Sequence, residues 1–401
     1  HCVTGVQTCA LPISLFEAHE VGTAEVRDLT SAAPEAARAV VTLYHAYKRL
    51  QETSEALAAA FPDVEAADGG RLSSEEVTAL LQRHENHFPE LEAGAEDLWR
   101  RAHLDRQDLW PGLLRHLERE LGYTVRFTPG DPAEPVLRRF DPDRRVLTLS
   151  ELLPTRSRNF ELAATIGLLT QTRAIDELLA DAALTTDASR TLARVALANA
   201  FAGAVLMPYE PFLAAARQAR YDIDIIARRF RVSFEQAAHR LTALRRPGAE
   251  GIRFHFVRMD AAGNISKRFS ASGIRFARFS GTCPRWNVFA AFQTPGLIRV
   301  QISQMPEGDA YFCIARTIQK ESFGWHAQPP LLAIGLGCSI EEAHGLVYAD
   351  GIDLRNERNV VPVGVTCRTC TRTDCTQRAV PSLRGPIRID EHVRRVSPYT
   401  A

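Results

Sequence analysis

The sequence contains no uninterrupted apolar run of 18 residues, so it predicts no membrane-spanning helix. Its opening residues do not combine a basic start with an apolar core, and we therefore predict no secretory signal peptide. Lys and Arg together number 48, as do Asp and Glu, and a net charge of zero gives no sign of a nucleic-acid coat or a membrane-binding surface. These absences favour a cytoplasmic protein.

A starting Met is also missing. The first thirteen residues, HCVTGVQTCALPI, differ in character from the rest and resemble translated sequencing-adapter sequence. We therefore interpret residues 1–13, with Cys2 and Cys9, as an artefact that is not part of the fold. On this interpretation the natural start of the protein is expected to be missing.

The composition, with 401 residues of which 45% are hydrophobic, is sufficient for two or three packed cores. Residues 14–95 are rich in helical periodicity and predict a helical linker that offers a dimerisation surface. Residues 96–246 predict strands near 122–127 and 136–150, followed by helices near 158–169 and 189–206. Residues 247–401 predict a β-rich domain, with strands over 274–280 and 331–338 and a short helix over 341–348. The expected fold class is α+β.

The central region resembles a small zinc-peptidase domain of the ImmA/IrrE type that has lost its chemistry. Such domains carry HExxH on a helix, where two His bind zinc and the Glu acts as general base. The stretch RNFELAATIGLLTQ (158–171) follows that pattern, but Ala164, Thr165 and Leu168 occupy the three functional positions. LANAFAGAVLMP (197–208) resembles the downstream stretch, with Leu197 in place of the acidic ligand. We therefore expect no peptidase activity and no catalytic residues.

The C-terminal part has a denser resemblance. Residues 246–296, YFCIARTI (311–318), LLAIGLGC (331–338), LVYADGIDL (346–354) and CRTCTRTDCTQRAVPSL (367–383) resemble the short-chain fatty acyl-CoA regulator family. The resemblance implies XRE-type bacterial transcription regulators, with a degenerate peptidase-like domain between an N-terminal helix-turn-helix and a C-terminal effector domain. It implies sensing of short-chain acyl-CoA and control of acetate, propionate or glyoxylate-pathway genes. The N-terminal DNA-binding helix-turn-helix is expected to be missing from this sequence.

Three of the cysteines have metal-ligand spacing. Cys367, Cys370 and Cys375 form a C-x2-C-x4-C set, which suits Zn²⁺ or an iron–sulfur cluster. A fourth ligand is needed, and we favour Cys283 in Gly-Thr-Cys-Pro over Cys338 in Gly-Leu-Gly-Cys. Family resemblance favours a [4Fe–4S] cluster over zinc. Cys313 lies within an apolar strand and is predicted to be a core residue.

An acyl-CoA effector requires cations for its phosphates and an apolar pocket for its acyl chain. The candidate residues lie in segments where cationic and aromatic side chains alternate: Lys267, Arg268, Arg275, Arg278, Trp286 and Arg372. A solvated sheet face explains the same alternation.

Residues 219–246 resemble a helix-turn-helix, and their arginines could contact DNA phosphates. We favour a structural role, in which this segment packs as an extension of the peptidase-like core.

Two other functions remain open. One is an iron–sulfur redox regulator that does not bind acyl-CoA, and the other is a CoA-ester hydrolase that uses a thiol such as Cys283. The expected partners are acyl-CoA, DNA through the N-terminal domain, and a second copy of the chain in a homodimer or larger oligomer.

Overall fold

The computed structural model describes residues 73–130, 136–180, 182–277, 281–320 and 328–383, together with Glu35, residues 42–44, Tyr47, residues 325–326, Ile389 and residues 391–399. The chain divides into two compact units, residues 1–66 and residues 67–401. Most of the first unit, including the adapter-like stretch and most of the predicted dimerisation region, lies outside the described residues. The second unit holds almost all of the described residues.

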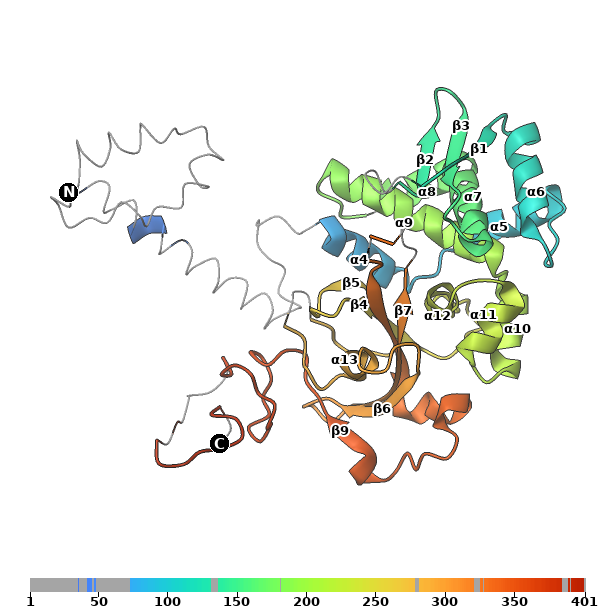
Figure 1. Cartoon of the computed structure of the whole chain (residues 1–401). Coiled ribbons are helices and arrows are strands. Elements are labelled where there is room, and N and C mark those ends of the chain that lie inside the picture. Colours follow the sequence, from blue (N-terminus) through green and yellow to red (C-terminus); the bar gives the residue numbers. More distant parts are fainter. Residues whose placement is uncertain are drawn as a thin grey trace. The chain divides into compact units, whose positions relative to one another are not determined.

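The first half of this unit is mainly helical and holds a small three-stranded sheet (Figure 1). Strand β3 is the middle strand, parallel to β1 and antiparallel to β2. The elements in chain order are α4 (Ser73–Arg83), α5 (Pro89–Arg101), α6 (Leu109–Arg115), a π-helical turn (His116–Glu120), β1 (Thr124–Thr128), β2 (Arg138–Asp141), β3 (Val146–Ser150), α7 (Thr155–Thr170), α8 (Thr172–Ala180), α9 (Asp187–Leu206), α10 (Tyr209–Gln218), α11 (Ile223–Phe230) and α12 (Phe234–Leu241).

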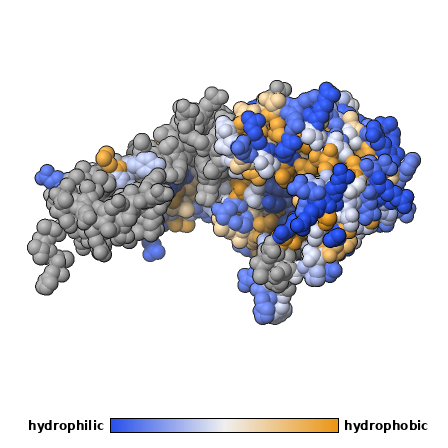
Figure 2. Space-filling view, turned by 90° about the horizontal axis from the view of Figure 1, so that it is seen from above, coloured by the Kyte–Doolittle hydropathy of each residue, from blue (hydrophilic) through white to orange (hydrophobic). Residues whose placement is uncertain are grey.

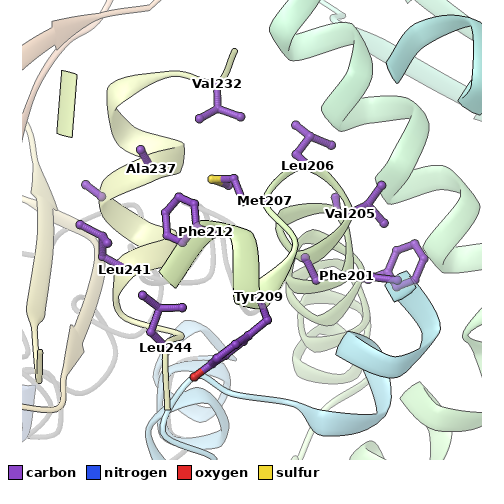
Figure 3. Close-up of a cluster of buried hydrophobic side chains, with 14 of the residues drawn as sticks. Phe201, Val205, Leu206, Met207, Tyr209, Phe212, Val232, Ala237, Leu241 and Leu244 are labelled. Carbon is purple, nitrogen blue, oxygen red and sulfur yellow. The ribbon is translucent and has the colours of Figure 1, made fainter. Parts of the chain in front are cut away.

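The two helices predicted near 158–169 and 189–206 are present as α7 and α9. Helix α9 begins where the hydroxyl of Thr186 accepts a hydrogen bond from the backbone N–H of Ser189, which satisfies one of the unpaired donors of the first turn. It ends before Pro208. Its last turn leads into a buried apolar cluster in which Met207 lies near Phe212 and Val232 (Figure 3). The apolar stretch 197–208 is therefore part of the core.

The second half of the unit is built on a six-stranded sheet with the order β5-β4-β8-β7-β6-β9. Neighbouring strands are antiparallel except β6 and β9, which are parallel. The elements are β4 (His255–Met259), β5 (Ile265–Ser270), α13 (Asn287–Ala291), β6 (Arg299–Gln304), β7 (Ala310–Gln319), β8 (Leu331–Ser339), three 3-10 turns (Ile340–Gly345, Val347–Ala349 and Glu357–Asn359) and β9 (Val360–Pro362).

Alternate residues of a strand point to opposite faces of the sheet. Both faces of this sheet carry buried side chains. Phe256, Phe312 and Leu336 belong to the same core cluster as the helices of the first half. Val257 and Cys313 belong to a second cluster that includes residues of α13. One continuous core therefore joins the helical half to the sheet, and a smaller core lies on the opposite face.

The helix-turn-helix-like segment forms α11 and α12, joined through Arg231, which has a left-handed backbone with φ 54°. The second helix is not presented to solvent. Glu235 and Arg240 on α12 are only 6% and 4% exposed. A recognition helix must offer its side chains to a DNA groove, so this geometry agrees with the structural role that we favoured.

Two local predictions are wrong. No strand covers the described part of 274–280, because Gly273 has φ 90° and the chain leaves the sheet there. The side chain of Phe276 instead packs against His255 and Trp286. The helix predicted over 341–348 is a pair of short 3-10 turns, because the first ends at Gly345, a residue that is unfavourable inside a helix, and the extended backbone of Leu346 separates it from the second.

Within the described ranges, no single helix is long and apolar enough to cross a membrane, and α9 with α10 meets the criterion only as a pair bent by 66°. Seen from above, hydrophobic residues interrupt the hydrophilic surface of the molecule (Figure 2). The exposed apolar side chains of the helical half include Phe127, Leu137, Leu152, Leu192 and Val195.

Candidate functional site

Four cysteines from two distant segments line one small cavity. Cys283 lies in the loop before α13, and Cys367, Cys370 and Cys375 lie in the loop after β9. The cavity between them has a volume of about 10 Å³, which is room for roughly one water-sized sphere. As the side chains stand, no group of three or more His, Cys, Asp or Glu among the described residues forms a closed metal-binding cluster.

The loop that carries three of these thiols is held by Arg378, whose side chain is 5% exposed. Its guanidinium donates hydrogen bonds to the carbonyl oxygens of Cys367 at 2.8 Å and Cys370 at 3.1 Å, and also to that of Arg372. The backbone N–H of Cys370 donates to Thr366. A planar guanidinium can reach several acceptors at fixed angles, so one side chain fixes the path of the loop.

Cys283 is tied to the same region through its backbone. Its N–H donates to the carbonyl of Val365 at 3.0 Å. Trp286, three residues later, donates from its indole Nε1 to the carbonyl of Gly364 at 2.9 Å. A Cβ atom at Gly364 would lie 2.9 Å from the Cys370 sulfur, so only glycine leaves space for that thiol. Burial raises the pKa of the Cys283 thiol, and the neighbouring Cys367 and Cys370 raise it further.

The other two cysteines of the domain lie elsewhere. Cys338 is fully buried on β8, opposite Phe312 of β7, and does not line the cysteine cavity. Cys313 lies on β7 with its sulfur 3.5 Å from Nε2 of His255, and burial raises the pKa of its thiol to about 12. Burial also lowers the pKa of His255 to about 3, so both groups of this pair are neutral at neutral pH.

The described residues among those predicted to bind acyl-CoA lie in different surroundings. Lys267 and Arg268, both on β5, pair with Glu235 at 3.4 Å and with Glu75, respectively. Arg275 is exposed in the loop after β5, and Arg278 lies outside the described residues. Trp286 is buried between α13 and the loop that carries Phe276. Arg372 lines the cysteine cavity and donates to the carbonyls of Val363 and Gln304.

Glu235 is the centre of a charge cluster that the sequence did not reveal. Its carboxylate contacts Arg258 at 2.7 Å, Lys267 at 3.4 Å and Lys320 at 2.5 Å. Burial alone would raise its pKa, but the three cations together lower it to about 2. Arg258 of β4, Lys267 of β5 and Lys320, which directly follows β7, are therefore engaged with a buried carboxylate of α12.

On helix α7, the three positions that correspond to the His, Glu and His of HExxH carry Ala164, Thr165 and Leu168, none of which is a usual zinc ligand. Ala164 and Thr165 are buried, and Leu168 is partly buried. The hydroxyl of Thr165 donates to the carbonyl of Glu161 and accepts from Arg138 Nη1 at 3.2 Å. Leu197 on α9 is fully buried in the core.

A larger cavity, of about 450 Å³, lies in the helical half. It opens between the end of α5, the start of α6, α10 and the end of α11. Its lining comes from separate segments of the chain: Trp99, Arg106, Leu109, Leu206, Pro208, Pro211, Ala214, Ala215, Gln218, Arg229 and Phe230. No local motif links these residues, so sequence reasoning had no signal from which to find the cavity.

Comparison with protein families matches the two halves of the unit separately. Residues 118–242 match the model described as IrrE N-terminal-like domain, and residues 243–399 match the model described as short-chain fatty acyl coenzyme A regulator, C-terminal. The class of this protein is therefore defined by two parts, an IrrE-like domain followed by a regulator C-terminal domain.

The chain is 40% identical to the HTH-type transcriptional regulator RamB of Mycobacterium tuberculosis over 383 residues. This alignment covers 94% of the chain and 80% of the relative. It is 37% identical to the HTH-type transcriptional regulator PrpR of the same species (96% and 79%) and 38% identical to the propionyl-CoA carboxylase regulator of Cereibacter sphaeroides (94% and 79%). A solved structure described as a Mycobacterium tuberculosis transcriptional regulator matches with a TM-score of 0.78 and 39% identity, over 82% of this chain and all of that one. The chain belongs to the short-chain fatty acyl coenzyme A regulator family.

Proposed function

We infer that this chain is the effector-sensing part of a bacterial transcription regulator of short-chain fatty acid metabolism, with short-chain acyl-CoA as its effector. The observation that carries this proposal is the identity of about 40% to named transcription regulators across both the IrrE-like half and the regulator domain. In the protein that contains this chain, effector binding would change operator affinity, because a ligand shifts an equilibrium by its different affinity for two states. Such a regulator would act on DNA in the cytoplasm.

The proposal also includes a metal centre held by Cys283, Cys367, Cys370 and Cys375. Four sulfur donors around one point suit a tetrahedral Zn²⁺ or an iron–sulfur cluster. Family resemblance favours a [4Fe–4S] cluster, with zinc as the alternative. The cavity of about 10 Å³ is closer to the size of a single ion than to that of a four-iron cluster, so a cluster would need the segments around it to separate. When bound, the centre would join the α13 loop to the loop after β9.

Metal analysis of protein purified without oxygen tests the centre. We expect about one zinc, or about four irons with matching sulfide, per chain. Replacing Cys283 with Ala should abolish binding, and the matched Cys338→Ala variant should keep it, since Cys338 lies outside the cavity. Retention of metal by Cys283→Ala and its loss from Cys338→Ala would overturn the assignment of the fourth ligand.

Thermal unfolding with free CoA and with acetyl-, propionyl-, butyryl- and long-chain acyl-CoA tests the effector. A ligand present at a hundredfold over its Kd stabilises by about 2.7 kcal/mol, which gives a measurable rise in Tm. Stabilisation confined to short acyl chains would support the proposal. The absence of any shift with intact metal would overturn it in favour of a redox regulator. Release of free CoA thiol would favour the hydrolase, for which the neutral, buried Cys313–His255 pair is a poor candidate.

A further inference from the structure

We propose that a basic surface, formed by α11, α12 and the adjoining end of the six-stranded sheet, binds the phosphate backbone of DNA without reading its sequence. Six cationic side chains define this basic surface: Arg228, Arg231, Arg258, Lys267, Arg316 and Lys320. The choice of DNA as the polyanion rests on the proposed function, a regulator that acts on DNA. The surface itself goes beyond that function, because the effector proposal makes no use of it.

Cross-strand pairing places three of these cations in one row on the helix-facing side of the sheet. Lys267 of β5 is paired with Arg258 of β4, which is paired with Ile334 of β8. Ile334 is in turn paired with Arg316 of β7. Directly paired residues of neighbouring strands lie on the same face of a sheet, and Ile334 belongs to the core that the sheet shares with the helices. The row therefore lies on the side of α11 and α12, and Lys320 directly follows its β7 end.

The two helices continue the basic surface outward. Arg316 contacts Asp224 in the first turn of α11 at 2.6 Å, and its guanidinium lies 4.9 Å from the ring of Phe234 at the start of α12. Arg228 comes one helical turn after Asp224 and so lies on the same side of α11. Arg231, in the turn between the helices, comes three residues before Phe234. Both arginines are exposed, and within the described part of the chain neither forms an ion pair.

The basic surface carries more positive charge than its carboxylates neutralise. Three of its cations share the single carboxylate of Glu235, Arg316 is paired with Asp224, and the other two cations are unpaired. Six cations against two carboxylates leave a surplus of four positive charges. The side chains of Lys267 and Lys320 are 45% and 42% exposed, so they can contact an anion from the side opposite Glu235. A DNA duplex carries one negative charge per about 1.7 Å of its axis, so several neighbouring phosphates match such a surplus.

These contacts are to phosphates and not to bases. Glu235 and Arg240 of α12 are buried, so this helix cannot enter the major groove to read base edges. Lysine and arginine contacts to phosphates fix a protein on the duplex and carry no sequence information. The basic surface therefore adds affinity for any operator that the regulator recognises.

Fluorescence anisotropy of the purified chain with a short labelled duplex of mixed sequence tests the basic surface. With about four phosphates neutralised, log Kd should rise with log salt with a slope of about 3.6, which is roughly a hundredfold loss of affinity between about 50 and 200 mM salt. Arg228→Gln/Arg231→Gln should lower this slope by about 1.8, and Lys320→Gln should lower it by about 0.9. The matched control is Arg119→Gln, which removes an exposed arginine of the π-helical turn before β1 and should leave the slope unchanged.

A variant that gains affinity separates this proposal from a loss caused by misfolding. Asp224→Asn keeps the shape of the side chain but leaves Arg316 without its counter-charge. Duplex binding should become tighter, and the slope should increase by about 0.9.

Three results would contradict the proposal. Absence of duplex binding by the parent chain at about 50 mM salt would overturn the basic surface, as would equal slopes in the parent, Arg228→Gln/Arg231→Gln and Asp224→Asn. Tighter binding of a poly-glutamate peptide than of the duplex would overturn DNA as the partner. The unfolding experiment with acyl-CoA contains no DNA, so a chain that is stabilised by short-chain acyl-CoA but binds no duplex would lose the basic surface and keep its proposed effector. A chain that binds the duplex but no CoA species would lose the effector alone.

Discussion

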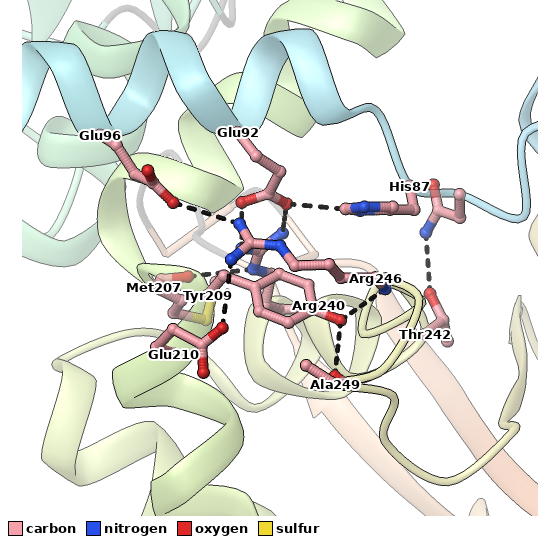
Figure 4. Close-up of polar contacts among 11 residues, drawn as sticks. His87, Glu92, Glu96, Met207, Tyr209, Glu210, Arg240, Thr242, Arg246 and Ala249 are labelled. Carbon is pink, nitrogen blue, oxygen red and sulfur yellow. Dashed lines mark hydrogen bonds and ion pairs between the residues drawn. The ribbon is translucent and has the colours of Figure 1, made fainter.

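Arg240 and Glu92 form a two-pronged ion pair inside the protein, with Nη1–Oε1 and Nη2–Oε2 distances of 2.5 and 2.8 Å (Figure 4). The residues are 4% and 5% exposed. The remaining Nε donor of Arg240 reaches the carbonyl of Met207 at 3.0 Å. One guanidinium thus connects α12, α5 and the end of α9 through three hydrogen bonds to buried acceptors.

Replacing Arg240 with Met should strongly destabilise the fold, because Glu92 would keep its place in the core without its counter-charge. Breaking a buried pair in this way typically costs about 3–5 kcal/mol. Urea unfolding measures the loss. The double variant Arg240→Met/Glu92→Leu should recover most of it, because no unpaired charge remains.

The matched control is Arg173→Met, which breaks an ion pair between two exposed residues, Arg173 and Glu177. We expect little change there, because exposed pairs contribute little. Equal destabilisation by Arg240→Met and Arg173→Met would contradict the role given to the buried pair.

The sequence was informative where neighbouring residues carry the signal. The helix predicted near 189–206 agrees closely with α9, whose ends at Thr186 and before Pro208 are marked by local residues. The Cys-Pro at Cys283 suggested a ligand setting, and the structure places this residue in one cavity with Cys367 and Cys370. Family resemblance, rather than periodicity, predicted how the two halves are joined.

Sequence was uninformative where distant segments meet. Lys267 and Arg268 fit an alternating cationic strand, but Glu235 and Glu75, which neutralise them, lie on helices far away in the chain. The large cavity draws residues from α5 to α11, so no spacing revealed Arg106 or Arg229. Only the tertiary structure decides which cations are already paired.

Replacing Gly167 and Gly203 with Ala should change the stability of the protein in opposite directions. A Cβ at Gly167 of α7 would lie 2.7 Å from the ring of Phe201, which is fully buried and has little room to move. Gly167→Ala should therefore destabilise by about 1–3 kcal/mol. A Cβ at Gly203 of α9 meets no atom within 4 Å, so Gly203→Ala should stabilise by about 0.5–1 kcal/mol through helix propensity.

Urea unfolding of both variants measures whether the first loses and the second gains stability. Adding Phe201→Leu to Gly167→Ala should relieve part of its cost. Destabilisation by Gly203→Ala would contradict the open space at that position.

Stability should fall as the pH drops below 6.5, partly because of His255. Burial lowers the pKa of this imidazole to about 3, whereas in the unfolded chain it is near 6.5. Between these values the unfolded state binds a proton that the folded state does not, so stability rises with pH in this window and is lost on acidification. Lowering the pH from 6.5 to 5 should cost about 2 kcal/mol from this group.

Glu235 affects stability at a lower pH than His255 does. Its pKa is about 2 in the fold and about 4.5 otherwise, so its contribution is present above pH 4.5 and is lost as the pH falls toward 2. Unfolding titrations of His255→Asn and Glu235→Gln separate the two effects. The first variant should reduce the slope above pH 4.5 without abolishing it, because burial also lowers the pKa of His239 to about 3, and the second should change the slope only below that value. Identical slopes in the parent and both variants would exclude these groups as the cause.

Arg378 should control the order of the cysteine loop. Lysine at this position keeps the charge but presents its donors from a single nitrogen, which cannot reach the carbonyls of Cys367, Cys370 and Arg372 as the guanidinium does. Arg378→Lys should therefore lower the metal content per chain and make residues 363–383 more sensitive to trypsin. Arg368→Lys is the matched control, because Arg368 is exposed on the same loop.

Should the loop of Arg378→Lys resist trypsin as well as that of the parent, with the same metal content, the carbonyl contacts of Arg378 would not be what holds the loop. Should both lysine variants lose metal equally, the effect would belong to the charge of the loop rather than to the buried guanidinium.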